Sequence, residues 1–253
     1  MAKRLIINAD DCNLTCGVTR GILRAHDRGI VTSTTIMMNL PLSEQTVEEI
    51  KKRKSLGLGI HLNVTFARPL SRPSQIPTLL KPDGTFRRPD DYQKKLPSEK
   101  EIAREYETQV KLFEARFEKK PDHLDTHHHL HDHPLFFRAL AYVARKRGLP
   151  IRRSSVFQRS LARETAGFKT TDYLFGNLSA AFLWEPVSFG GVVENLPEGT
   201  SEIACHPGFY DAELRRVSSL RQAREQELRL FANRQLRNKL SGLGIELISF
   251  SQI

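Results

Sequence analysis

The stretch LIINADDCN, residues 5–13, begins as an apolar run and ends with two adjacent acidic residues, Asp10 and Asp11. The apolar part, residues 5–9, has the composition of a short buried strand. Burial of two like charges is costly unless each has a partner. The pair is therefore either a helix-capping turn, because aspartate is favoured just before a helix N-terminus, or part of a site that supplies an opposite charge.

Beyond this stretch, short apolar or β-rich runs alternate with amphipathic helical patterns. The expected strands are residues 5–9, 33–38, 58–63, 123–126, 203–206 and 245–250. Such alternation is typical of repeated βα units around a mostly parallel sheet or barrel. We expect an α/β fold in a single domain, residues 1–253, because no change of composition marks a linker.

Three helices are expected from their apolar periodicity. Ser98 and Glu101 have the spacing of a capping box, at the start of a helix that continues to Phe117. A second helix should begin at Pro134 and stop at Gly148. Apolar residues at a spacing of four over residues 228–240 predict one long last helix.

Two segments do not follow this alternation. Residues 64–97 are rich in proline and should form a long ordered excursion, which is either a functional lid or a simple surface insertion. Residues 154–200 are mixed in pattern. In this part we expect a helix around residues 172–183 and a strand around residues 187–193.

The chain carries 39 Lys and Arg against 29 Asp and Glu, a formal net charge of +10. This charge would suit nucleic acid or an acidic ligand, but the basic clusters have no interleaved aromatic residues for base stacking. We interpret them as a solvated surface and expect no nucleic-acid partner. Cysteines at positions 12, 16 and 205 show no disulfide-framework spacing, which favours a reducing, cytoplasmic compartment. We expect neither a signal peptide nor a membrane span.

Polar side chains of the kind that bind metals lie at or near the ends of four of the expected strands. They are Asp10 and Asp11, His61 in GLGIHLN, the cluster HLDTHHHLHDH at residues 123–133, and His206 in IACHPG. Each alone has a simpler interpretation, such as a core histidine, a surface tract or the end of a strand. In parallel α/β proteins, however, reacting groups gather at the carboxyl ends of the strands. We therefore expect these side chains to meet at one mouth.

A carboxylate with two imidazoles can hold a divalent cation while leaving positions for water and substrate. If Asp11 binds the cation, Asp10 can act as the base, and His206 can protonate the leaving group. These parts suit hydrolysis of an amide or an ester. A metal phosphoesterase and a non-catalytic protein that binds metal, sugar or nucleic acid are the alternatives.

At these residues the chain resembles the YdjC-like family of carbohydrate deacetylases, which includes chitooligosaccharide and hopanoid-associated deacetylases. The stretches that carry the resemblance are LIINADDCNLTCGVTRGILRAHDRGIVTSTTIMMN, LGLGIHLNVT, PDHLDTHHHLHDHP and EIACHPGFYD. The resemblance implies a distorted, incomplete TIM-like (β/α) barrel with a divalent-metal site at the strand ends. It also implies removal of acetyl from N-acetylated sugars, especially N-acetylglucosamine units of short oligosaccharides.

Carried over by position, the resemblance assigns the metal ligands to Asp11, His61 and His127, the base to Asp10 and the acid to His206. Residues expected to support a ligand or to contact substrate are Asp125, His128, His129, Phe66 and Tyr210. Many members have an aromatic–glycine pair after the two acids, whereas CNLTCG follows here, and this departure bears on substrate preference more than on the chemistry.

The expected cofactor is one divalent metal ion, zinc or magnesium, although cobalt, nickel and manganese also accept nitrogen and oxygen ligands. The expected partner is a small acetylated carbohydrate, and a homodimer is left open.

Overall fold

The computed structural model describes residues 2–154, 167–176 and 183–253. The chain forms two compact units. The first unit consists of Met1–Ile36, Glu49–Leu58 and Thr171–Ile253, and the second consists of Met37–Glu48 and Gly59–Thr170.

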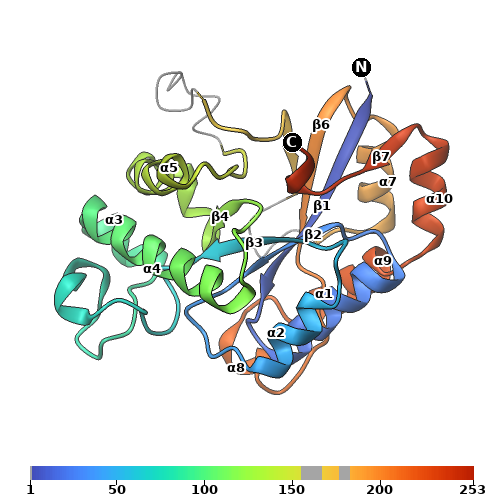
Figure 1. The fold of residues 1–253 in the computed structure, drawn as a ribbon. Coiled ribbons are helices and arrows are strands. Elements are labelled where there is room, and N and C mark those ends of the chain that lie inside the picture. Colours follow the sequence, from blue (N-terminus) through green and yellow to red (C-terminus); the bar gives the residue numbers. More distant parts are fainter. Residues whose placement is uncertain (1, 155–166, 177–182) are drawn as a thin grey trace. The chain divides into compact units, whose positions relative to one another are not determined.

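Strand β1 (Lys3–Cys12) is the centre of the first unit (Figure 1). It pairs in parallel with β2 (Ser33–Ile36), β6 (Gly199–Cys205) and β7 (Ile245–Leu247), and β5 (Tyr173–Phe175) pairs with β6. The residues of β1 from Leu5 onward are all buried. A strand covered on both faces needs a continuous apolar run rather than alternation, which is what residues 5–7 provide.

Helices pack around these strands. In the first unit they are α1 (Cys16–Arg28), α7 (Pro186–Glu194), α8 (Leu214–Val217), α9 (Gln222–Phe231), α10 (Gln235–Gly242) and the short η5 (Phe250–Gln252). Helix α1 is capped by Thr15, whose side chain accepts a hydrogen bond from the N–H of Val18 at 3.2 Å. This cap satisfies one of the unpaired N–H groups of the first turn, so the helix starts directly after the acidic pair.

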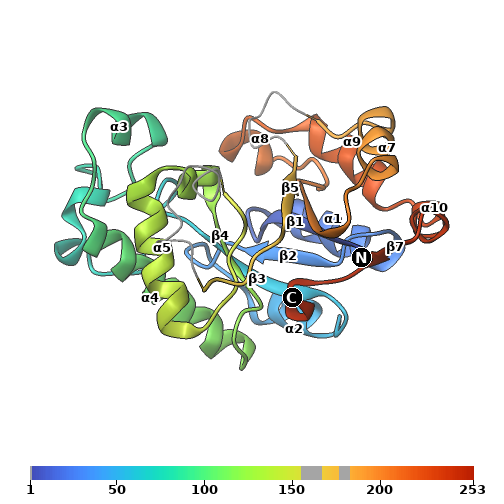
Figure 2. The ribbon, with the colours of Figure 1, turned by 90° about the horizontal axis from the view of Figure 1, so that it is seen from above.

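Strands β3 (Gly57–Leu62) and β4 (Leu124–Thr126) pair in parallel in the second unit, with His61 opposite Asp125. Its helices are α3 (Pro89–Lys94), α4 (Glu99–Phe117), α5 (Pro134–Arg147) and the short η1 (Pro73–Gln75), η2 (Pro77–Leu79) and η3 (His127–Asp132), while α2 (Glu44–Lys51) crosses the boundary between the units. Helices α4 and α5 lie side by side (Figure 2). A Cβ on Gly59 would lie 2.4 Å from the His123 ring, so only glycine fits beneath this histidine.

The strand order is β4-β3-β2-β1-β6-β5, and every strand pair with a described register is parallel. The two end strands of this series, β4 and β5, are not paired with each other among the described residues. The predicted α/β fold of the incomplete (β/α)-barrel type, with mostly parallel strands, is therefore confirmed.

Of the expected helices, the one that begins at Pro134 is confirmed, and Gly148 ends it with a left-handed backbone (φ 66°). The capping box at Ser98 is wrong, because Ser98 makes no side-chain cap and the Glu101 carboxylate instead accepts from the N–H of Thr78 at 2.7 Å. The single last helix is also wrong, since α9 ends at Phe231 and α10 begins at Gln235.

The mixed segment was predicted incorrectly in both places where it can be compared. The strand expected at residues 187–193 is helix α7, which starts with Pro186 in its first turn and buries Phe189 and Val193, four residues apart, on one face. The helix expected around residues 172–183 is strand β5 where it is described, and residues 177–182 lie outside the described chain.

Residues 64–97 form an ordered excursion, as predicted. The buried Tyr92 hydroxyl donates to the carbonyl of Val64 at 2.6 Å, and Glu105 of α4 accepts from the N–H groups of Leu70 and Ser71. Its role as a lid stays a prediction. No helix in the described part of the chain combines the length and the apolar character that crossing a membrane would require.

Candidate active site

The carboxyl end of β1 departs from regular strand geometry where the two acids stand. The pairing of β1 with β2 shifts register between Ala9 and Cys12, and Asp11 has a left-handed backbone with φ 67°. A bulge of this kind re-aims side chains, and positive φ in a residue other than glycine is strained. A regular strand would place the two neighbouring acids on opposite faces, and the irregularity changes these directions.

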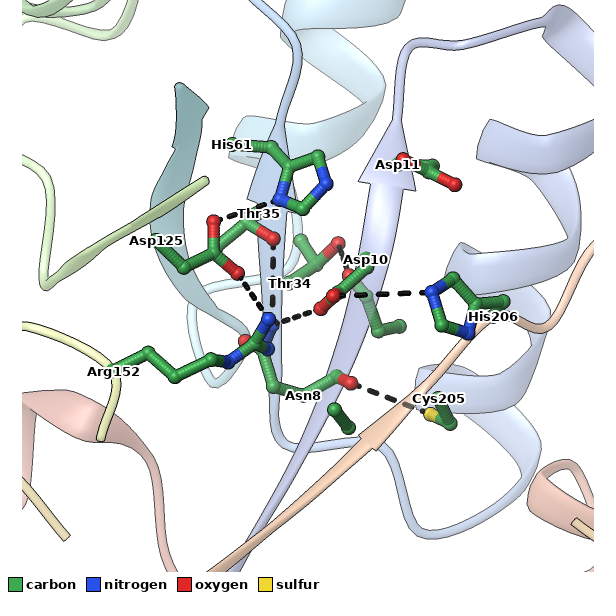
Figure 3. A network of polar contacts seen from close by, with 12 residues as sticks. Asn8, Asp10, Asp11, Thr34, Thr35, His61, Asp125, Arg152, Cys205 and His206 are labelled. Carbon is green, nitrogen blue, oxygen red and sulfur yellow. Dashed lines mark hydrogen bonds and ion pairs between the residues drawn. The ribbon is translucent and has the colours of Figure 1, made fainter. Parts of the chain in front are cut away.

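Asp10 is buried, with 2% exposure, and is held by Asn8, whose side-chain amide donates to Asp10 Oδ1 at 2.8 Å. The His206 Nε2 lies 3.9 Å from Asp10 Oδ2 (Figure 3). Because Ala9 is opposite Cys205 in the parallel register of β1 and β6, the two strand ends bring this predicted base and acid together.

Asp11 has a partner that the sequence did not reveal. Arg224 Nη2 donates to Asp11 Oδ2 at 2.6 Å, and both side chains are nearly inaccessible to solvent. The helix-capping interpretation of the acidic pair is not supported, since Thr15 caps α1. The opposite charge that accompanies Asp11 in the first unit is the Arg224 guanidinium.

His206 directly follows β6, and its backbone N–H donates to the carboxylate of Glu227. The same carboxylate accepts from the N–H of Trp184 at 3.2 Å. Burial raises the pKa of Glu227, while His206, these two N–H groups and Arg224 oppose that effect. Trp184 is buried and donates to the carbonyl of Ala204 at 2.8 Å, so it belongs to the core.

In the second unit, Asp125 lies between two cationic or potentially cationic groups (Figure 3). His61 Nδ1 is 2.7 Å from Asp125 Oδ1, and Arg152 Nη1 is 2.7 Å from Asp125 Oδ2. All three side chains are almost completely buried. Asp125 therefore contacts both the His61 imidazole and the Arg152 guanidinium. Sequence reasoning missed Arg152, because in the sequence it is only one member of several basic pairs.

The histidine run leaves β4 through a tight turn. Helix η3 contains left-handed backbone at His128 (φ 56°) and His129 (φ 53°). The His127 ring lies beside His61, with centroids 5.2 Å apart, and 6.5 Å from the Phe66 ring. Of the three consecutive histidines, His127 is thus the one placed next to His61.

The other two histidines of the run have different neighbours. His128 Nδ1 is 2.8 Å from Thr65 Oγ1, and its ring stacks against that of His127 with centroids 3.9 Å apart. His129 Nε2 is 3.7 Å from Asp132 Oδ2, and the His129 ring lies beside the ring of His131. The left-handed backbone of His128 and His129 costs about a few kcal/mol in total. Backbone strain of this kind is concentrated at functional sites.

Tyr210 belongs to the first unit and is 38% exposed, with its N–H donating to Glu225 at 3.1 Å. The first unit thus brings together Asp10, Asp11 and His206, and the second brings together His61, Asp125, His127, His128 and Phe66.

Cys12 is fully buried, which raises the pKa of its thiol to about 12, whereas Cys16 is exposed.

The sequence pattern that defines YdjC-like proteins matches residues 4–242 of this chain. The chain belongs to the YdjC-like family. A carbohydrate deacetylase of Clostridium beijerinckii is 33% identical over 253 residues, which cover 99% of this chain and 100% of that protein. A carbohydrate deacetylase of Brevibacillus brevis is 33% identical over 254 residues, covering 99% of each.

A crystal structure from Enterococcus faecalis, described as that of a proposed cellobiose-phosphate cleavage protein, shares this YdjC-like fold. It superposes with a TM-score of 0.89 at 28% identity and covers 100% of this chain and 99% of its own. The expected family is confirmed, and the expected class of enzyme, a deacetylase and hence a hydrolase, is that of the curated relatives.

Proposed function

We propose that this protein is a metal-dependent carbohydrate deacetylase that removes acetyl groups from N-acetylated sugars, with N-acetylglucosamine-containing oligosaccharides or conjugates as the substrate class. The observation that carries the proposal is the pair formed by the buried Asp10 and the partly exposed His206 at the adjoining ends of β1 and β6, with His206 Nε2 3.9 Å from Asp10 Oδ2. The names of the curated relatives support the same reaction. A paired carboxylate and imidazole can supply both proton transfers that amide hydrolysis requires.

We further propose that one divalent ion is held by Asp11, His61 and His127. These three belong to the described side chains that could serve as metal ligands. The donor set fits, because one carboxylate and two imidazoles suit zinc and leave open positions. The contact of His61 Nδ1 with Asp125 also fits, since a carboxylate usually fixes the ring of a ligating histidine and directs Nε2 toward the ion.

In this proposal the chain's own residues carry the proton transfers. Asp10, held by Asn8, accepts the proton of the attacking water, and His206 gives a proton to the departing sugar nitrogen. A bound divalent ion supplies Lewis-acid polarisation of the acetamide carbonyl. Arg152 and Asp125 hold His61 in place without touching substrate.

Phe66 is the aromatic side chain that we propose to contact the sugar, because its ring lies 6.5 Å from His127 and the side chain is partly exposed. An aromatic face packs well against the apolar face of a pyranose. Tyr210, exposed in the first unit, is a second candidate for this contact.

The decisive experiment measures acetate released from N,N′-diacetylchitobiose by the zinc-loaded protein. We expect release by the wild-type protein and a loss of about 100-fold or more in Asp10→Asn, because general base catalysis contributes roughly 10²–10⁴-fold. Asp90→Asn, an exposed aspartate of α3, is the matched control and should keep full activity. No acetate from any N-acetyl sugar after full loading with zinc, magnesium, cobalt, nickel and manganese in turn would disprove the proposal.

A further inference from the structure

Helix α9 carries two buried charged side chains, although none of the site residues predicted from the sequence lies on this helix. Arg224 is 2% exposed and Glu227 is 3% exposed. They stand three positions apart, so they share one face of the helix. Because a buried charge is costly without a partner, both must be engaged, and both engage the strand ends that carry Asp11 and His206.

Arg224 fixes the position of Asp11. Its Nη2 donates to Asp11 Oδ2 at 2.6 Å, and its Nε donates to the carbonyl of Leu220 at 3.1 Å, which holds the guanidinium in one orientation. Asp11 needs such a support, because its left-handed backbone lies outside the range that a strand itself imposes. A charge-assisted hydrogen bond to one carboxylate oxygen directs the other oxygen.

Glu227 fixes the position of His206 through its backbone. The carboxylate accepts hydrogen bonds from the N–H groups of His206 and Trp184, which ties the backbone that carries the imidazole to the helix. One further contact comes from the helix backbone, where the Arg224 carbonyl accepts the N–H of Gly208 at 3.1 Å. The segment that contains His206 is therefore attached to α9 at His206 itself and again at Gly208, two residues further along.

The helix is anchored independently of the site. Its last residue, Phe231, accepts the N–H of Ile30 at 3.0 Å, and the Phe231 ring packs on Phe189 with centroids 5.6 Å apart. Leu228 is buried as well. An element fixed by its own core contacts can serve as a reference point for the groups attached to it.

We propose that Arg224 and Glu227 are the positioning residues of this site, so that one face of α9 sets the place of both the Asp11 carboxylate and the His206 imidazole. The inference rests on the proposed function and deepens it. Buried charged side chains alone are weak support for stability, since apolar residues of similar volume often replace them without loss. Placement of a ligand and an acid gives Arg224 and Glu227 a function that apolar residues could not supply.

The test of Arg224 compares Arg224→Gln and Arg224→Lys with Arg229→Gln, an exposed arginine of the same helix. Cobalt(II) is titrated calorimetrically into metal-stripped protein. We expect Arg224→Gln to bind cobalt about 10–100-fold more weakly, the usual effect of removing a group that orients a metal ligand. Arg224→Lys, which keeps the charge but not the planar fork, should recover part of the loss, and Arg229→Gln should match the wild type.

The test of Glu227 uses Glu227→Gln, with Glu246→Gln, an exposed carboxylate of β7, as the control. Because Glu227 holds the acid and not a ligand, its variant should lose about 10-fold or more in kcat for acetate release while cobalt affinity and KM stay within about twofold. Amide hydrogen exchange at His206 should become faster in this variant and stay unchanged in the control, since one acceptor oxygen replaces a carboxylate.

Four outcomes separate this inference from the proposed function. An active wild type together with Arg224→Gln and Glu227→Gln variants within twofold of it in every readout overturns the inference alone. An inactive wild type that binds no cobalt removes the proposed function, and unchanged exchange at His206 in Glu227→Gln then overturns the inference as well. If Arg224→Gln fails to fold, Arg224→Lys replaces it in the test. A cobalt affinity of Arg224→Lys equal to that of the wild type contradicts an orienting role of Arg224.

Discussion

At Asp125, three buried side chains depend on one another. The carboxylate lies 2.7 Å from both His61 Nδ1 and Arg152 Nη1, and neither Asp125 nor Arg152 is exposed. The parallel register that puts Asp125 opposite His61 explains why a predicted ligand and its orienting group come from different strands. The Arg152 guanidinium is buried away from solvent, and this carboxylate is its partner.

Replacement of Asp125 by asparagine should therefore reduce stability as well as orientation of His61. We expect Asp125→Asn to lower the free energy of unfolding by about 3–5 kcal/mol, the usual result of removing one partner of a buried ion pair. Urea unfolding followed by circular dichroism measures this loss. The double variant Asp125→Asn with Arg152→Met should regain part of it, and a single-variant loss below 1 kcal/mol would show that the pair is not structurally important.

The three cysteines should differ sharply in reactivity. Burial raises the pKa of Cys12 to about 12, so below that pH it stays a protonated, unreactive thiol, and Cys205 is buried with its Sγ donating to the carbonyl of Asn8. At pH 8 we expect a thiol reagent to modify Cys16 alone in the native protein and all three cysteines in urea. Cys16→Ser should abolish the native reaction, and reaction of a second native thiol would contradict the described burial.

Chemically typical residues could be predicted from the sequence, and their supports could not. Asp10, His61, His127 and His206 stand out because each lies at or near the end of an expected strand. Arg152 and Arg224 look like any surface arginine in a chain of net charge +10, because nothing local marks them as buried. Their partners lie up to 213 positions away, and pairing over that separation is decided only by tertiary structure.

At the scale of elements, helix α1 and the segment after β6 approach each other closely. A Cβ on Gly21 would lie 2.5 Å from the Cα of Gly208, and a Cβ on Gly17 would lie 2.3 Å from Asp211 Oδ2. Asp211 accepts from the N–H of Gly17 at 2.8 Å, so this contact is also hydrogen-bonded. The glycine face of α1 thus lets the segment that begins at His206 lie directly on the helix.

Gly21→Ala should push these two elements apart. We expect it to lower the free energy of unfolding by about 1–3 kcal/mol, as overpacking does, and to reduce kcat through displacement of His206. Gly191→Ala in α7 is the matched control, because a Cβ there meets nothing within 4 Å. That substitution should stabilise the helix by about 0.5–1 kcal/mol. Equal effects of the two substitutions in thermal melts would contradict the close contact.

Elements with strong periodicity were predictable, whereas short apolar segments were not. The helix at Pro134–Arg147 has both a proline start and a glycine stop, and the structure matches it. The segment at residues 187–193 is rich in valine and was predicted as a strand, yet it forms α7 because Phe189 and Val193 bury one helical face. In short segments such packing outweighs the β propensity of valine.

At the scale of the whole molecule, the proposed ligands come from segments that are far apart in the chain. Asp11 lies near the end of β1, His61 lies near the end of β3, and His127 directly follows β4. The family resemblance and the strand order account for much of this arrangement, because parallel strands deliver their carboxyl ends to one side of a sheet. An ion that binds ligands from all three segments must stabilise the folded chain relative to the unfolded one, in which no such site exists.

Metal removal should consequently lower the melting temperature. At a free zinc concentration 100 times the dissociation constant, binding contributes about 2.7 kcal/mol, which corresponds to roughly 5–10 °C for a chain of this size. Differential scanning calorimetry of chelator-treated and zinc-reloaded protein measures the shift. His127→Ala should abolish it, whereas His26→Gln, at a histidine that contacts Ser55 and is not a proposed ligand, should leave it intact. A shift of the same size in His127→Ala would place the ion elsewhere, because a site that keeps its affinity without this imidazole does not use it.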